Sequence, residues 1–159
     1  MVDRDGRPLS EPAVVDRNAS GLVAGGADRF IVVSGGLAQN QYRIVGNGTE
    51  TIATGVIGFE PVDAVWDGNF FTVLGYRVLW QNGRARYTTS IQRIDRNGST
   101  LSVTTGSALY PPIDWRLIPA GGAVAVLAPE VERFTDAHDA GLLRYQFSWL
   151  EQRRRAVAR

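Results

Sequence analysis

The feature that most constrains this fold is a pair of short motifs that recur in step along the 159 residues. One is a polar turn ending in glycine, found as DRDG at 3–6, VGNG at 45–48 and DRNG at 95–98, with glycine spacings of 42 and 50 residues. The other is an apolar run after a short turn, found as DRFIVVSG at 28–35, DGNFFTVLG at 67–75 and GGAVAVLA at 121–128. A shared period of about 40 to 50 residues is typical of four-stranded propeller blades. The sequence therefore predicts an all-β chain of tandem four-stranded antiparallel blades, β-propeller-like, with about three blades per chain.

Short β segments separated by turn signals fill blades that span about 20–56, 60–106 and 113–150. Asp-Gly and Asn-Gly suit the corners, because tight hairpins need positive φ. The third blade ends after its third strand, so we expect the N-terminal segment 7–15 to complete it as a fourth strand. Residues 1–150 then form a single repeat domain, followed by a basic tail at 151–159.

Three blades are too few to close a propeller, which has about 4 to 8. An open arc exposes apolar sheet faces and unpaired strand edges. We therefore expect a homo-oligomer, in its simplest form a ring of two copies, or a larger protein assembly, or a chain that is part of a longer protein. A compact β fold other than a propeller is the remaining interpretation.

The composition of the chain limits the classes of partner that it can bind. A net charge of +1 gives no attraction to nucleic acid, and no apolar run is long enough to insert into a membrane. Cysteine is absent, which removes disulfides and thiolate chemistry, and the start of the chain lacks a signal peptide. All 17 basic side chains are arginine, which we interpret as the coding bias of a high-GC bacterium; selection for anion binding would require them to cluster in one groove.

Two stretches of the second repeat carry a resemblance to a known family. PVDAVWDGNFFTVLG at 61–75 and SIQRIDRNGSTLS at 90–102 are similar to the V-A-W-D-G and R-V-D-x-D-G motifs in the tandem blades of secreted bacterial β-propeller proteins. The matching residues are Trp66, Asp67, Gly68, Phe71, Val73, Arg93, Asp95, Gly98 and Leu101. The resemblance implies a propeller and an extracellular or cell-surface location, and it implies no catalytic residues.

Function on a repeat scaffold usually resides in the variable loops. The largest insertions are a hairpin at 76–87 and a loop at 129–141, with 109–112 between them. Aromatic and arginine side chains there can stack on a sugar ring or anchor a protein partner, whereas a purely structural role would have Tyr76 and Trp80 cover the hairpin's own apolar side. The candidate binding residues are Tyr76, Trp80, Arg84, Arg86, Tyr110 and His138.

Metal and cofactor sites have little support in the sequence. Asp136, His138 and Asp139 form the one cluster with metal-capable side chains, but their spacing matches no established metal loop, and we interpret them as a solvated acidic loop. We therefore predict no metal and no cofactor.

The favoured function is a non-enzymatic binding or structural module that presents loops to a glycan or protein partner. The alternative is a glycan-processing hydrolase, which needs two carboxylates facing each other across a cleft. Glu60, Asp63, Asp67 and Asp114 are available, but nothing in the sequence marks a pair. Aligning Gly48 with Gly98 also places Arg43 and Arg93 at equivalent positions, which we interpret as cross-strand pairing on a sheet surface.

Overall fold

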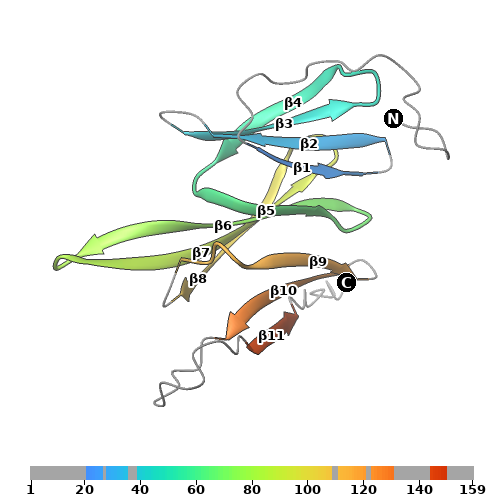
Figure 1. The fold of residues 1–159 in the computed structure, drawn as a ribbon. Coiled ribbons are helices and arrows are strands. Elements are labelled where there is room, and N and C mark those ends of the chain that lie inside the picture. Colours follow the sequence, from blue (N-terminus) through green and yellow to red (C-terminus); the bar gives the residue numbers. More distant parts are fainter. Residues whose placement is uncertain are drawn as a thin grey trace, which may run out of the picture.

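The computed structural model describes residues 21–26, 28–35, 39–108, 111–120, 123–130 and 144–149. Within these ranges the chain forms strands joined by turns, and it contains no helix. Three antiparallel sheets follow one another along the chain (Figure 1). The all-β class and the four-stranded antiparallel sheets predicted from the sequence are confirmed.

Each sheet is a meander, because every strand pairs with its neighbour in sequence. The first sheet consists of β1 (Leu22–Gly25), β2 (Arg29–Ser34), β3 (Asn40–Gly46) and β4 (Thr51–Ile57). The second consists of β5 (Glu60–Trp66), β6 (Phe70–Gln81), β7 (Arg84–Asp95) and β8 (Thr100–Ala108). The third has the order β11-β10-β9, from β9 (Arg116–Ala120), β10 (Ala123–Glu130) and β11 (Arg144–Trp149). The predicted fourth strand at 7–15 and the tail at 151–159 lie outside the described residues.

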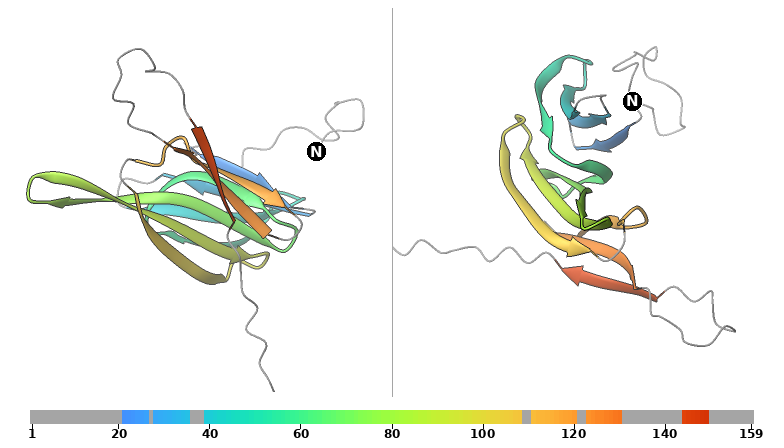
Figure 2. Two further views of the ribbon diagram at one scale, coloured as in Figure 1. Left: turned by 90° about the horizontal axis from the view of Figure 1, so that it is seen from below. Right: turned by 90° about the vertical axis from the view of Figure 1, so that its left-hand side faces the viewer.

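The second sheet packs on both of its faces, because successive side chains of a strand point to opposite sides. Phe71 and Val73 of β6 join a buried cluster with Ile31 of the first sheet. Leu74, the next residue, belongs to another cluster with Val126 of the third sheet. The described sheets are therefore stacked face on face (Figure 2), and they form an open stack, not a closed barrel or ring.

The first strands of the three sheets lie next to one another. Strand β5 contacts both β1 and β9. Asp63 in β5 reinforces one of these junctions, since its Oδ2 accepts a hydrogen bond of 2.7 Å from the backbone N–H of Leu117 in β9. The sheets are thus joined along their first strands as well as through their apolar faces.

The turns between the third and fourth strands of the first two sheets share one backbone geometry, shifted by one residue from the glycine alignment. Thr49 N donates to Gly46 O over 3.0 Å, as Gly98 N donates to Asp95 O over 3.1 Å. Thr49 therefore takes the place of Gly98, and both have positive φ, 68° and 88°. The expected equivalence of Gly48 and Gly98 is wrong because the hydrogen-bonded closure, not the glycine, sets the register.

The DRNG turn also holds two sheets together. The guanidinium of Arg29 in β2 donates to Arg96 O over 2.6 Å and to Asn97 Oδ1 over 3.0 Å. The hydroxyl of Tyr42 in β3 donates to Gly98 O over 2.7 Å. A motif interpreted from the sequence as a local turn therefore also bonds the first sheet to the second.

Candidate functional site

The hairpin predicted at 76–87 is a two-stranded ribbon that extends beyond its sheet. Strand β5 pairs with β6 as far as Tyr76, and β8 pairs with β7 as far as Tyr87, so the strands run on together to the turn between them. That turn is Asn82-Gly83, with φ of 51° and 73°. Positive φ at both central residues matches the twist of an antiparallel pair, which explains the Asn-Gly sequence. We call residues 76–87 the ribbon.

Side chains divide between the two faces of the ribbon according to its register. Trp80 lies opposite Ala85 and Val78 opposite Tyr87, whereas Leu79 lies opposite Arg86 and Gln81 opposite Arg84. Directly opposed residues share a face. One face, the aromatic face, thus carries Tyr76, Val78, Trp80, Ala85 and Tyr87. The other, the arginine face, carries Arg77, Leu79, Gln81, Arg84 and Arg86.

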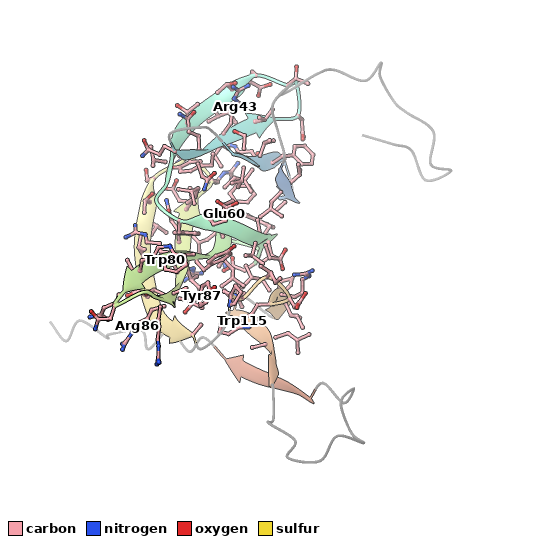
Figure 3. The ribbon with its side chains drawn as sticks, turned by 60° about the vertical axis from the view of Figure 1, so that its left-hand side comes forward. Arg43, Glu60, Trp80, Arg86, Tyr87 and Trp115 are labelled. Carbon is pink, nitrogen blue, oxygen red and sulfur yellow. The ribbon has the colours of Figure 1, made fainter. Side chains whose placement is uncertain are left out.

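The two aromatic candidates have different surroundings. Tyr76 is half-buried and packs edge-on against Tyr87, with ring centroids 6.2 Å apart. Trp80 is 74% exposed, so it does not cover the ribbon's own apolar side. Figure 3 shows Trp80 and Arg86 on the part of the ribbon that projects from the sheets. Tyr76 therefore packs within the ribbon, whereas most of the Trp80 side chain is exposed to solvent.

A surface hollow of about 460 Å³ lies at the base of the ribbon, lined by Phe59, Glu60, Tyr76, Arg77, Val78 and Leu79. Arg77 Nε donates to Gly58 O over 2.5 Å, and Asn40 Nδ2 donates to Phe59 O over 2.8 Å. The first bond holds the chain before β5 against the ribbon, and the second holds it against β3. Among the described residues, 77–81 of β6 pair with β7 alone.

The carboxylates considered for hydrolysis serve structural roles where the structure shows their contacts. Asp63 accepts hydrogen bonds from the N–H groups of Ala64 and Leu117. Asp67 is bonded to Arg93 and closes the turn before β6. Asp114 and Glu60 are exposed, and Glu60 lines the hollow.

The other predicted site residues lie either outside the described residues or on the ribbon. Tyr110, Asp136, His138 and Asp139 lie outside the described residues. Among the residues that the structure does describe, no group of three or more metal-capable side chains comes together. Arg84 and Arg86 are exposed on the arginine face, as the binding hypothesis requires.

Sequence reasoning missed the free edge of β6 and the separation of the ribbon into two faces. The alternation of residue types from 76 to 81 carries the signal for the two faces, since a strand places every second side chain on one side. No feature of residues 76–81 in the sequence predicts the free edge of β6, because that edge depends on the residue at which β5 begins to pair with β6.

Across the described ranges, no helix has the length and apolar character needed to cross a membrane. Comparison of the chain with protein-family models, with curated proteins and with solved structures finds no match.

Proposed function

We propose that this chain is a non-enzymatic binding module in which a β-propeller-like scaffold presents the ribbon to a partner. The observation that carries the proposal is the position of Trp80, which is 74% exposed on a ribbon that extends past both flanking strands. Leu79 and Val78 beside it are 55% and 42% exposed. Tryptophan, tyrosine and arginine are the residues that most often dominate the free energy of binding at protein interfaces.

Of the two partner classes expected from the sequence, a protein is the better supported. Residues 77–81 of β6 pair with β7 alone among the described residues, so an extended segment of a partner can add to this edge as a further strand. Val78 and Leu79 lie on opposite faces there and suit the alternating side chains of such a segment. Arg84 and Arg86 on the arginine face favour an acidic partner. A glycan would use Trp80 for stacking and would need none of the strand edge.

The propeller-like scaffold is supported by the stacking of the sheets. The first strands β1, β5 and β9 adjoin, as the innermost strands of propeller blades do, and the middle sheet packs on both faces. Closure requires further sheets, so the proposal includes a homo-oligomer or a larger protein assembly. It also includes the extracellular or cell-surface location that the sequence resemblance implies.

A screen against immobilised glycans and candidate protein partners tests the function. Trp80→Ala and Arg84→Ala are each expected to weaken binding, with a loss of roughly 30-fold or more for Trp80, the scale of an interface hot spot. Val103→Ala is the matched control, because Val103 is an exposed apolar residue of β8 outside the ribbon, 53% exposed. Binding that survives both ribbon substitutions unchanged would show that the site lies elsewhere.

No observation among the described residues supports the alternative that the chain is a hydrolase. Asp63 and Asp67 are engaged in the structural hydrogen bonds described above. Hydrolysis of a glycan by the purified chain, lost in a Glu60→Gln variant, would nevertheless establish it.

A further inference from the structure

Three Asn-Gly dipeptides occur in the chain, at 47–48, 82–83 and 97–98, and the structure describes all of them. Asparagine before glycine is the pair most prone to deamidation, because glycine has no side chain to hinder attack by its backbone nitrogen. That nitrogen must reach the Cγ atom of the asparagine side chain, which requires a particular backbone conformation. The fold therefore determines which of the three pairs reacts.

The turn at the tip of the ribbon has the reactive conformation within reach. Ring closure eclipses the asparagine Cβ with the next nitrogen, which requires a ψ of about −120°, the value of the first central residue in a type II′ turn. Types I′ and II′ both close two-residue hairpins, and both have positive φ at that residue. Of the three asparagines, Asn82 alone has positive φ, 51°. Rotation of the peptide unit between Asn82 and Gly83 interconverts the two turns, and glycine accepts the accompanying change in the sign of its φ.

The same turn lies where the structure can open locally. Residues 77–81 of β6 pair with β7 alone among the described residues, so two strands without a third lead to the tip. Gln81, Asn82 and Gly83 are exposed, and a Cβ at Gly83 would have no neighbouring atom within 4 Å. Exposed ends of this kind open with less free energy than the body of a sheet. Rotation of the peptide unit therefore meets little resistance here.

The DRNG turn holds its own Asn-Gly pair in an unreactive arrangement. The attacking nitrogen, Gly98 N, is engaged in a hydrogen bond of 3.1 Å to Asp95 O. Asn97 N donates to Asp95 Oδ1 over 2.8 Å. The side-chain oxygen of Asn97 accepts a hydrogen bond of 3.0 Å from Arg29 in the first sheet. Both the backbone and the side chain of this pair are thus fixed.

The third pair, Asn47-Gly48, lies inside a turn that two backbone hydrogen bonds close. Gly46 N donates to Glu50 O and Thr49 N donates to Gly46 O, each over 3.0 Å. The turn joins β3 and β4 within a four-stranded sheet, and the φ of Asn47 is not positive. We therefore expect this pair to react more slowly than Asn82-Gly83.

We propose that Asn82 is a site of spontaneous deamidation at the tip of the ribbon. The backbone nitrogen of Gly83 forms a bond to Cγ of Asn82, and the bond from Cγ to Nδ2 breaks. The Nδ2 amino group leaves with the Gly83 amide proton as ammonia, which produces a five-membered succinimide ring. Water then opens the ring at either carbonyl and restores a carboxylate at position 82, as aspartate or isoaspartate. One water is consumed for each ammonia released, and nothing is oxidised or reduced.

Deamidation would change the surface that the ribbon presents. Residues 76–87 contain Arg77, Arg84 and Arg86 and no acidic residue, so a new carboxylate removes one of three net positive charges. Isoaspartate also adds a carbon to the backbone within the turn that joins Gln81 to Arg84. The reaction itself needs no partner. Its failure would leave the proposed binding function untouched, and the absence of a partner would leave the modification site untouched.

Peptide mapping of the folded, full-length chain tests the proposal. The chain is incubated in mildly alkaline buffer and digested with trypsin, which separates the three pairs into peptides 44–77, 78–84 and 97–116. Mass spectrometry then measures the mass gain that accompanies replacement of an amide by a carboxyl group, with an unincubated digest as the baseline. We expect Asn82 to react roughly tenfold faster than Asn97, or more, since loss of even one hydrogen bond must precede reaction at Asn97. Equal rates would overturn the proposal.

Two controls test whether the turn is the cause. In urea the three rates are expected to converge, and a preference for Asn82 that survives unfolding would refute a conformational origin. Asn82→Gln is expected to abolish the mass gain of peptide 78–84. A gain that persists in this variant would place the reaction at Gln81 and overturn the assignment.

The converse variant removes the protection of the DRNG turn. Arg29→Gln takes away the donor to the Asn97 side chain and is expected to raise the rate at Asn97 while leaving that at Asn82 unchanged. Circular dichroism checks that the variant keeps its β structure. An unchanged rate at Asn97 in the folded variant would count against hydrogen bonding as the source of the selectivity.

Discussion

The guanidinium of Arg93 donates a hydrogen bond of 2.6 Å to the carboxylate of Asp67, whose side chain is 0% exposed. The other carboxylate oxygen accepts hydrogen bonds of 2.8 Å from the N–H groups of Asn69 and Phe70. Arg93 also lies over the ring of Phe70, 4.4 Å from its centroid. One buried carboxylate therefore closes the turn before β6 and neutralises an arginine of β7.

Asp67→Asn is expected to lower the free energy of unfolding by about 3 kcal/mol, because it leaves a poorly exposed arginine without its counter-charge. Urea denaturation followed by circular dichroism measures the loss. The matched control is Arg96→Gln, which breaks the exposed ion pair with Asp28, where the side chains are 54% and 51% exposed. Equal losses for the two variants would contradict the distinction between a buried and a surface pair.

The equivalence of Thr49 and Gly98 predicts opposite effects of substitution. Thr49→Gly is expected to raise the free energy of unfolding by up to about 1 kcal/mol, since a β-branched residue is strained at positive φ. Gly98→Ala is expected to lower it by about 1 to 3 kcal/mol, because the added methyl group would also overlap the side chain of Ala53. Thermal unfolding of the two variants checks both signs. A stabilising Gly98→Ala would be incompatible with the turn described here.

The junction between the second and third sheets depends on Asp63. Asp63→Ala leaves the backbone N–H of Leu117 without its acceptor and is expected to cost about 1 to 3 kcal/mol. Amide hydrogen exchange should become faster in β9 and β10 while that of the first sheet stays the same. Asp114→Ala, at an exposed carboxylate, is the control. Unchanged exchange at Leu117 in the Asp63 variant would show that the bond does not stabilise the junction.

Substitutions of two aromatic residues in β6 are expected to distinguish a side chain that stabilises the fold from one that is available for binding. Phe71→Ala is expected to cost about 3 to 5 kcal/mol, because it empties a core position. Trp80→Ala is expected to change stability by less than about 0.5 kcal/mol, because most of the ring is already in water. Unfolding curves of the two variants, measured together, give both changes in stability. A large loss for Trp80→Ala would mean that this ring is part of the fold and not of a binding surface.

Several features of the fold could be predicted from local sequence because local backbone geometry determines them. Asn82-Gly83 marks a hairpin turn since both residues tolerate positive φ. The run from Phe70 to Leu74 marks a buried strand, and Asp67 marks the turn before it. The turn signals between short β segments predicted antiparallel four-stranded sheets. Each of these signals depends only on residues close together in the chain.

Other features depend on residues that are distant in the sequence and come together only in the folded chain. Which carboxylate is structural depends on contacts such as Asp63 with Leu117, across 54 positions. The exposure of Trp80 depends on where β5 and β8 stop pairing with the ribbon.

The sequence by itself determined the class of fold, the order of the strands and the position of the long hairpin, because periodicity and turn chemistry are short-range properties of a polypeptide. Only the tertiary structure decided the one-residue shift between Thr49 and Gly98 and the face on which Val23 lies. A shift of one residue moves a side chain to the opposite side of a sheet, and hydrogen bonds between distant strands set that register.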